Sequence, residues 1–206
     1  MFTDKTQKEF NEISEVSFFE NANCMTDFCS PWDNNPFSEI EFRAVWNTDN
    51  IFFNFSVFDT DIYIDRKDNS VDSIGNSDRV ELFFRINETL NPYYCLEIDA
   101  NARLMDFKAF PNWNFDFNWK WPHEDYDLKA KTNKNGFFVQ GRISLQSLKE
   151  LNLLQNNILE VGVYRAKFSK DENQNYTPTW ISWVNPNTST PNFHTATSFG
   201  KFKLVK

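Results

Sequence analysis

The chain has little glycine, cysteine and histidine. Its 206 residues include 5 Gly, 3 Cys and 2 His. Three cysteines are too few for a disulfide framework, so we expect free or buried thiols, although a bridge between Cys24 and Cys29 stays open. The cysteines and histidines together provide too few soft ligands at suitable spacing to predict a zinc site.

Basic charge and membrane-spanning runs are also missing. The formal net charge of −8 argues against a nucleic acid or an anionic membrane as partner, because both need a basic face. No apolar run approaches the roughly 20 residues of a membrane span. The start, MFTDKTQKEF, lacks the basic and apolar regions of a secretory signal, so none is predicted in the sequence as given. The sequence predicts neither a compartment nor an oligomeric state.

Aromatic residues are abundant, with 23 Phe and 7 Trp. Aromatic side chains favour pleated, half-buried surfaces, so this composition predicts β structure. Several runs alternate between apolar and polar residues, which is typical of strands with one buried face. These runs are 51–58, 79–86, 93–100, 158–168, 179–183 and 199–205. The alternation predicts a core of Phe53, Phe55, Leu82, Phe84, Leu96, Ile98, Val161 and Val163.

Local signals add one hairpin and one helix. Lys134-Asn135-Gly136 separates two strand-like runs, and Asn-Gly readily adopts positive φ, which favours a hairpin. Ser144 can cap a short helix in which leucines recur at helical spacing. We therefore predict a single all-β domain over 1–206, an antiparallel, jelly-roll-like β-sandwich with one short helix. Residues 1–30 are expected to be irregular, with 14–23 as a candidate edge strand.

Several segments, in order, resemble a known family. They are WNTDNIFFNFSVFDTDI, SDRVELFFRI, PYYCLEIDANARLMDF, FFVQGRISLQSLKEL and WISWVNPNTSTPNFHTATSFGKFKL. Their order and spacing, from about Trp32 to Lys206, are similar to those of carbohydrate-binding module family 9 and its relatives. The resemblance implies a β-sandwich, often stabilised by calcium, that binds a polysaccharide or oligosaccharide without catalysing its cleavage. It also suggests an extracellular protein.

The resemblance implies a sugar site on one sheet. In the sugar-binding members, two tryptophans hold the sugar while a glutamate, an arginine and an asparagine bond its hydroxyl groups. The glutamate corresponds to Glu81, and the arginine and asparagine fall near Glu97 and Asp99, which differ in type. One tryptophan falls near Gly75 and is lost, and the other falls on Phe193, which is still aromatic.

The run NWNFDFNWKW (112–121) offers replacement rings. As a strand it would place all five aromatic side chains on one face, but Pro111 and Pro122 bracket it, which favours a long loop. We expect Phe115 and Phe117 to pack on the sandwich. Trp113 and Trp119 are expected to be partly exposed, where a sugar ring could stack on them. Burial of all five rings is the alternative.

Glu81 and its acidic neighbours have other interpretations. Strand alternation places Glu81 opposite the core residues, where it could pair with Arg85, Arg103 or Lys108 instead of a sugar. Glu81, Glu97 and Asp99 could share one sheet face and act as a glycosidase pair. Such enzymes need two carboxyl groups roughly 5–10 Å apart, one of them with a raised pKa. No catalytic motif accompanies these residues, so we expect no enzyme.

Two cofactors are further alternatives. Asp59, Asp61, Asp65, Asp68 and Asp72 bring hard oxygen ligands into one loop, so a structural calcium ion is a candidate although the EF-hand spacing is absent.

Relatives of this fold that bind haem through Met with His or Lys suggest the other cofactor. The available residues are Met25, Met105, His123 and His194. No spacing indicates a pair among them, and a packing role or a backbone hydrogen bond is the expected role of His194.

Overall fold

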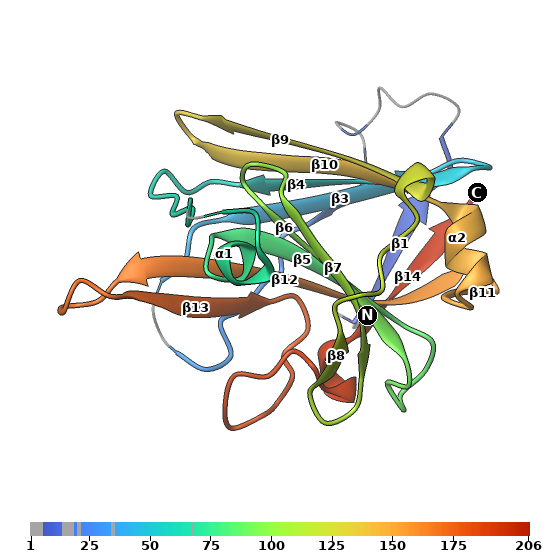
Figure 1. Cartoon of the computed structure of the whole chain (residues 1–206). Coiled ribbons are helices and arrows are strands. Elements are labelled where there is room, and N and C mark those ends of the chain that lie inside the picture. The colour runs from blue at the N-terminus through green and yellow to red at the C-terminus, as the bar shows by residue number, and fades with distance from the viewer. Residues whose placement is uncertain (1–5, 14–18, 20–21, 34–35, 67) are drawn as a thin grey trace.

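The computed structural model describes residues 6–13, 19, 22–33, 36–66 and 68–206, and within them two β-sheets form a sandwich (Figure 1). The larger sheet has the strand order β1-β14-β12-β5-β6-β7-β8, and β11 and β13 pair with β12 outside this path. Its strands are β1 (Gln7–Asn11), β5 (Arg79–Arg85), β6 (Tyr93–Asp99), β7 (Leu104–Phe110), β8 (Asn114–Asp116), β11 (Leu154–Gln155), β12 (Ile158–Lys170), β13 (Tyr176–Ser182) and β14 (Gly200–Val205).

The smaller sheet has the order β2-β3-β4-β10-β9. Its strands are β2 (Cys24–Met25), β3 (Ile40–Trp46), β4 (Asn50–Val57), β9 (Tyr126–Asn133) and β10 (Gly136–Ser144). The remaining elements are helices α1 (Val71–Gly75) and α2 (Leu145–Glu150) and the 3-10 turns η2 (His123–Asp125) and η3 (Ala196–Ser198). The pairing between named strands is antiparallel except for that of β1 with β14. The predicted all-β sandwich is confirmed.

The main core lies between the two sheets, where the alternating apolar residues of each strand meet. All eight predicted core residues are buried, each with at most 3% of its surface exposed. Trp121, the last ring of the aromatic run, joins them and contacts Phe84 at 5.9 Å between ring centroids.

The two local predictions are also confirmed, with one difference of detail. Ser144 accepts a hydrogen bond from the Ser147 amide and so caps α2. Strands β9 and β10 form the hairpin, and Asn133 pairs with Gly136 across a two-residue loop. The positive φ falls on Gly136 (147°), where a Cβ atom would come within 1.9 Å of the Val57 carbonyl oxygen. Glycine is therefore required by both backbone conformation and space.

The N-terminal part differs from its prediction as an irregular segment. Within 1–30, residues 7–11 form β1, which pairs with β14 in parallel, and 24–25 form β2. The candidate edge strand 14–23 lies largely outside the described residues. The three cysteines are free: Cys24 is exposed and Cys29 is half-buried.

The larger sheet is also covered on its outer face. Side chains that alternation places opposite the core form a second buried cluster, and the segments that cover them come from distant parts of the chain. The cluster comprises Ile74, Phe83, Leu90, Tyr93, Cys95, Met105, Phe107, Ala109, Tyr164, Phe193 and Phe199. Figure 1 shows the β7–β8 turn and the loop from β13 to β14 on the side of this sheet away from β3, β4, β9 and β10. This outer layer creates the candidate site.

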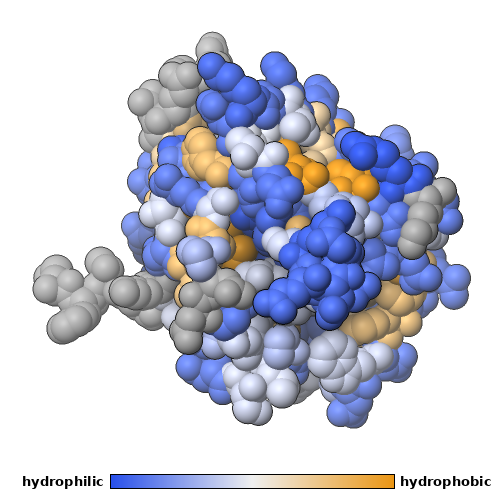
Figure 2. All heavy atoms as spheres, turned by 90° about the vertical axis from the view of Figure 1, so that its left-hand side faces the viewer, coloured by the Kyte–Doolittle hydropathy of each residue, from blue (hydrophilic) through white to orange (hydrophobic). Residues whose placement is uncertain are grey.

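One end of the sandwich is mostly polar. Figure 2 shows hydrophilic residues over most of this face, with small apolar areas between them. Monomeric proteins rarely expose large contiguous apolar patches, so scattered areas of this size need no partner. None of the described helices is long and apolar enough to cross a bilayer.

Candidate functional site

A pocket opens on the outer face of the larger sheet. Its floor is formed by side chains of β5 and β6. Its walls come from β13, the β7–β8 turn, the loop before η3 and Trp32, which lies between β2 and β3. The lining residues are Trp32, Arg79, Glu81, Glu97, Trp113, Trp180, Pro191, Asn192, Phe193 and His194.

Three charged side chains share the floor. Glu81 and Glu97 are direct cross-strand partners in β5 and β6, and they are only 1% and 4% exposed. Arg79 binds both: its Nε donates to Glu97 Oε2 at 2.6 Å, and its Nη2 lies 3.0 Å from Glu81 Oε1. The contact with Glu81 is an ion pair without the geometry of a hydrogen bond, so Glu81 Oε1 is buried without a hydrogen-bond donor among the described residues.

Burial changes the proton affinity of both carboxyl groups. Burial and the neighbouring charge of Glu97 raise the pKa of Glu81 to about 8, although Arg79 acts in the opposite direction. Burial also raises the pKa of Glu97, again against the effect of Arg79. In both cases the loss of water around the carboxylate outweighs the opposing effect of the guanidinium, and at Glu81 the like charge of Glu97 adds to the shift.

Three tryptophans and one phenylalanine surround the charged floor. Trp180 lies over the Arg79 guanidinium at 5.6 Å from the ring centroid. Its ring also meets Phe193 edge-on at 5.7 Å, and Trp32 packs against Phe193 at 5.4 Å. Trp113 stands at the rim with 58% of its surface exposed. Apolar ring faces therefore lie beside buried polar groups, which is the usual composition of a small-molecule site.

The aromatic walls are held by stacking and hydrogen bonds. Phe193 stacks on Tyr164 of β12 at 4.1 Å with an interplanar angle of 13°. The Tyr164 hydroxyl donates to Ser198 in η3, which ties the loop to the sheet. Trp32 Nε1 donates to the Thr188 carbonyl oxygen at 3.0 Å. These contacts fix the rings of Phe193 and Trp32.

His194 supports the rim between Trp113 and the sheet. Its Nδ1 lies 2.8 Å from the Tyr93 hydroxyl, and its ring stacks on Phe83 at 5.1 Å. The Trp113 ring packs edge-on against it at 5.0 Å. Burial and the nearby Arg79 charge lower the pKa of His194 to about 4, so the imidazole is neutral at pH 7. A packing role with a hydrogen bond agrees with the expectation from sequence.

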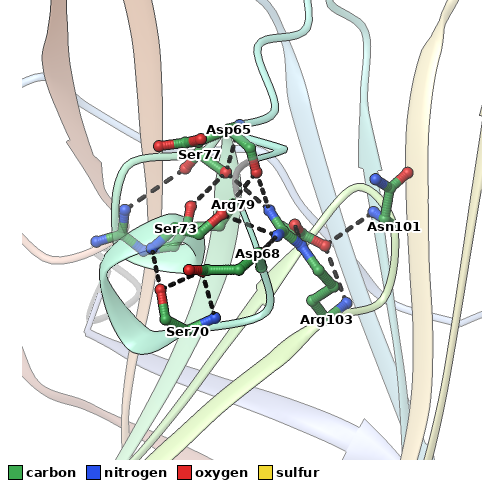
Figure 3. Close-up of polar contacts among 9 residues, drawn as sticks. Asp65, Asp68, Ser70, Ser73, Ser77, Arg79, Asn101 and Arg103 are labelled. Atoms are coloured by element: carbon green, nitrogen blue, oxygen red, sulfur yellow. Dashed lines mark hydrogen bonds and ion pairs between the residues drawn. The ribbon is translucent and has the colours of Figure 1, made fainter.

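The α1 region positions Arg79. Arg79 Nη1 donates to the Gly75 carbonyl oxygen at 2.6 Å, at the end of α1. The turn around α1 is held in turn by Arg103, which donates to the carbonyl oxygens of Asp65 and Asp68 and to the Ser73 and Ser77 hydroxyls (Figure 3). The guanidinium of Arg79 is thus anchored from behind the pocket.

Four of the six site residues predicted from sequence lie together in this pocket. Glu81, Glu97, Trp113 and Phe193 all line it. Glu81 pairs with Arg79, not with Arg85, Arg103 or Lys108. Their role in binding a sugar stays a prediction.

Asp99 and Trp119 do not line the pocket. Asp99 is fully buried and accepts hydrogen bonds from the Asn101 amide and the Arg103 side chain, so it shapes the turn after β6. Trp119 packs on the main core beside Tyr94 at 4.8 Å. In the rest of the run, Phe115 and Phe117 contact Phe107 on the outer face, as expected, although Phe117 is 37% exposed.

Sequence reasoning missed Trp32, Arg79, Trp180, Pro191 and Asn192. Two of them carried a usable signal. Arg79 shares the outward period of Glu81 in the same strand, and Ile181 and Trp183, both buried in the core, place Trp180 on the opposite face. Trp32 and Asn192 lie outside the named strands, where no alternation predicts a direction.

The Asp-rich loop does not fit a calcium site. Asp59 pairs with Arg165 at 2.5 Å, and Asp61 is 89% exposed in its side chain. Near α1, the guanidinium of Arg103 already occupies the oxygen-rich centre that a calcium ion would need. Across the described ranges, no three acidic, histidine or cysteine side chains are placed to hold a metal ion.

The candidate haem ligands are dispersed. Met25 is buried in the main core and Met105 in the outer cluster. His194 contacts Tyr93 at the pocket, while His123 belongs to η2 and contacts the Tyr126 ring at 5.7 Å. No two of the four residues form an axial pair, so haem binding has no structural support within the described chain.

Comparison with known proteins identifies similar sequences and folds. The family described as "Carbohydrate family 9 binding domain-like" matches residues 17–206. No curated protein matches the chain.

Three solved structures are similar over nearly the whole chain. A candidate carbohydrate-binding protein from Bacteroides uniformis ATCC 8492 has a TM-score of 0.72 at 14% identity, covering 97% of this chain and 99% of that one. A carbohydrate binding module family 9 from Caldicellulosiruptor kristjanssonii in complex with glucose gives 0.63 at 16% identity, covering 97% and 95%. The same module with cellotriose gives 0.61 at 16% identity, covering 96% and 93%. At these identities the likeness shows the fold alone.

Proposed function

Because the chain belongs to the carbohydrate family 9 binding domain-like family, we propose that it is a non-catalytic module that binds a polysaccharide or oligosaccharide. The ligand lies in the pocket on the outer face of the larger sheet. The observation that carries the proposal is the grouping of three tryptophans around the Glu81–Arg79–Glu97 floor. A sugar ring has apolar faces that stack on tryptophan and hydroxyl groups that bond to carboxylates, so it matches both parts of this surface.

Trp113 is the ring best suited to meet a ligand first. It is the most exposed of the large apolar side chains described, and its neighbours Phe115 and His194 hold it at the rim. It supplies an aromatic wall to the pocket and so replaces the tryptophan that is lost near Gly75. The known neighbours in complex with glucose and cellotriose support short gluco-oligosaccharides as the first ligands to test.

Tryptophan fluorescence tests the proposal. Glucose, cellotriose and other short oligosaccharides, free and blocked at the reducing end, are titrated into the protein. We expect the emission to shift or quench on binding, because three of the seven tryptophans line the pocket. Trp113→Ala should weaken binding by about 0.5–1.5 kcal/mol, the usual worth of one aromatic contact.

The matched control is Phe58→Ala. Phe58 is 40% exposed and lies outside the pocket, so its removal should leave binding unchanged. Both variants should keep the unfolding temperature of the parent chain to within a few degrees. Unchanged affinity in Trp113→Ala, or no fluorescence response to any sugar, would contradict the proposed site.

A glycosidase is the second candidate because Glu81 has a raised pKa and a carboxylate neighbour. The geometry opposes it. A glycosidase places the scissile bond between its two carboxyl groups. Here one guanidinium bridges Glu81 and Glu97, so no bond of a substrate fits between them.

A further inference from the structure

The pocket floor contains an excess of negative charge. When both are ionised, Glu81 and Glu97 carry two negative charges, and Arg79 supplies one positive charge. Among the residues that the structure describes, no other cation balances them: Arg85 is bound to Glu160, and His194 is neutral at pH 7. A buried carboxylate without a partner is costly, so the pair must hold a proton or receive a cation.

The hydrogen-bonding groups on the floor are acceptors. The Arg79 guanidinium is used by the protein, since Nε bonds to Glu97, Nη1 to Gly75 and Nη2 meets Glu81. Glu81 Oε1, by contrast, is buried and receives no hydrogen bond from the described residues. Glu81 and Glu97 both line the pocket, so its floor presents carboxyl groups to a ligand.

The walls also favour a cation. Trp32, Trp113 and Trp180 stand around the floor, and Trp180 already lies over one guanidinium. Aromatic faces attract ammonium groups most strongly when water is excluded. The formal net charge of −8 adds a long-range attraction for cationic ligands and repels acidic ones.

We propose that the pocket selects a sugar that carries a free ammonium group, such as a hexosamine unit, over neutral sugars and uronic acids. The inference rests on the proposed carbohydrate-binding function and names the class of sugar at the same site. The ammonium group lies against the Glu81 carboxyl group and completes the charge balance with Glu97 and Arg79. The raised pKa of Glu81 agrees with this. Without a cation beside it, the Glu81 carboxyl group keeps its proton, and the ammonium group takes the place of that proton.

The test compares single sugars of one shape and different charge. Glucosamine, glucose, N-acetylglucosamine and glucuronic acid are titrated at pH 7 by tryptophan fluorescence, and choline serves as a cation that is not a sugar. We expect glucosamine to bind about tenfold or more tighter than glucose, a ratio in line with close charge pairs at interfaces. Glucuronic acid should bind most weakly, and choline more weakly than glucosamine.

Two variants locate the effect. Glu81→Gln keeps the shape and removes the excess charge, so the glucosamine-to-glucose ratio should fall to about threefold or less. Glu172→Gln removes the same charge from the exposed β12–β13 turn and should leave the ratio as in the parent chain. The unfolding temperature of each variant shows that the comparison is made on folded protein.

The outcomes separate this inference from the proposed function. If glucose or cellotriose binds at the pocket at least as tightly as glucosamine, the module binds carbohydrate and the amino-sugar inference is wrong. If choline binds as tightly as glucosamine, the pocket recognises a cation and not an amino sugar. If no sugar of any charge binds, both proposals fail together.

Discussion

Glu81 illustrates how the surroundings of one residue decide its chemistry. Its place opposite the core residues follows from strand alternation, yet it is only 1% exposed because loops cover that face. The covering layer removes water, and removal of water raises the pKa of the carboxyl group. The same residue in an open sheet would be an ordinary solvated carboxylate.

The raised pKa predicts how stability depends on pH. The pKa of Glu81 is about 8 in the folded chain, against 4.5 for an ordinary glutamate. The folded state therefore binds more protons between these values, so this group lowers the free energy of unfolding as pH rises from 4.5 to 8. His194 has the opposite effect, because its pKa is lowered from 6.5 to about 4. Below pH 6.5 the unfolded state takes up the proton first, so this group lowers the free energy of unfolding as pH falls toward 4.

Between pH 6.5 and 8 the effect of the carboxyl pair can be measured without that of His194. In urea unfolding of the parent chain, the free energy of unfolding should be lower at pH 8 than at pH 6.5. In Glu81→Gln this fall should be smaller, while Glu172→Gln should behave like the parent. An equal fall in both variants would show that the pair does not titrate in this window.

Removal of the Phe84 ring measures what one core side chain contributes to stability. It is 3% exposed and packs against Trp121 between the sheets. Phe84→Ala should lower the free energy of unfolding by about 3–5 kcal/mol, because it loses buried apolar surface and leaves a cavity. Urea denaturation measures this change, and the exposed Phe58→Ala should cost within about 0.5 kcal/mol. A loss below about 1 kcal/mol would mean that the core collapses into the space.

At the scale of elements, local sequence signals were sufficient for α2 and for the β9–β10 hairpin. Both depend on a single position whose chemistry acts within a few residues: the Ser144 cap and Gly136. The β8 strand is different. Only Asn114–Asp116 of the aromatic run pairs with β7, although alternation extends over ten residues. The run then continues to Trp121 in the main core, so it crosses from the outer face of the larger sheet to the space between the two sheets.

The contacts of Arg103 around α1 lead to a prediction about calcium dependence. Arg103 makes five side-chain contacts there, to Asp99, to two backbone carbonyl oxygens and to two serine hydroxyls. We expect EDTA to leave the unfolding temperature unchanged, because the guanidinium already satisfies these oxygens. Arg103→Ala should destabilise the fold by about 3–5 kcal/mol, since it leaves the buried Asp99 carboxylate without its partner.

The control for Arg103 is an exposed basic residue. Lys129 is 79% exposed in its side chain, so Lys129→Ala should have little effect on the unfolding temperature. A fall in unfolding temperature on adding EDTA, restored by calcium, would contradict the expectation and support the ion that the resemblance implied.

At the scale of the whole molecule, we expect binding without catalysis. Neither member of the Glu81–Glu97 pair has the free approach to a glycosidic bond that an acid or a nucleophile needs, because Arg79 contacts both. Incubation with soluble polysaccharides should release no reducing sugar above a protein-free blank. Release that disappears in Glu81→Gln, and not in Glu172→Gln, would make the chain an enzyme.

The sequence alone was sufficient to predict the sandwich class, the core residues and four of the ten residues that line the pocket. The class, the core and the outward direction of Glu81 and Glu97 follow from period-two alternation, which acts along a single strand and needs no knowledge of its neighbours. Glu81 and Glu97 could be predicted in this way, since both lie at outward positions of β5 and β6.

Only the tertiary structure decided which residues meet at the site. Trp32, Trp180 and Phe193 lie in separate parts of the chain and come together because Phe193 stacks on Tyr164 of β12. Asp99 and Trp119 were also predicted for the site, but they face other partners, Arg103 and Tyr94. The physical reason is that the covering of a sheet face depends on contacts between distant segments, and local alternation contains no information about them.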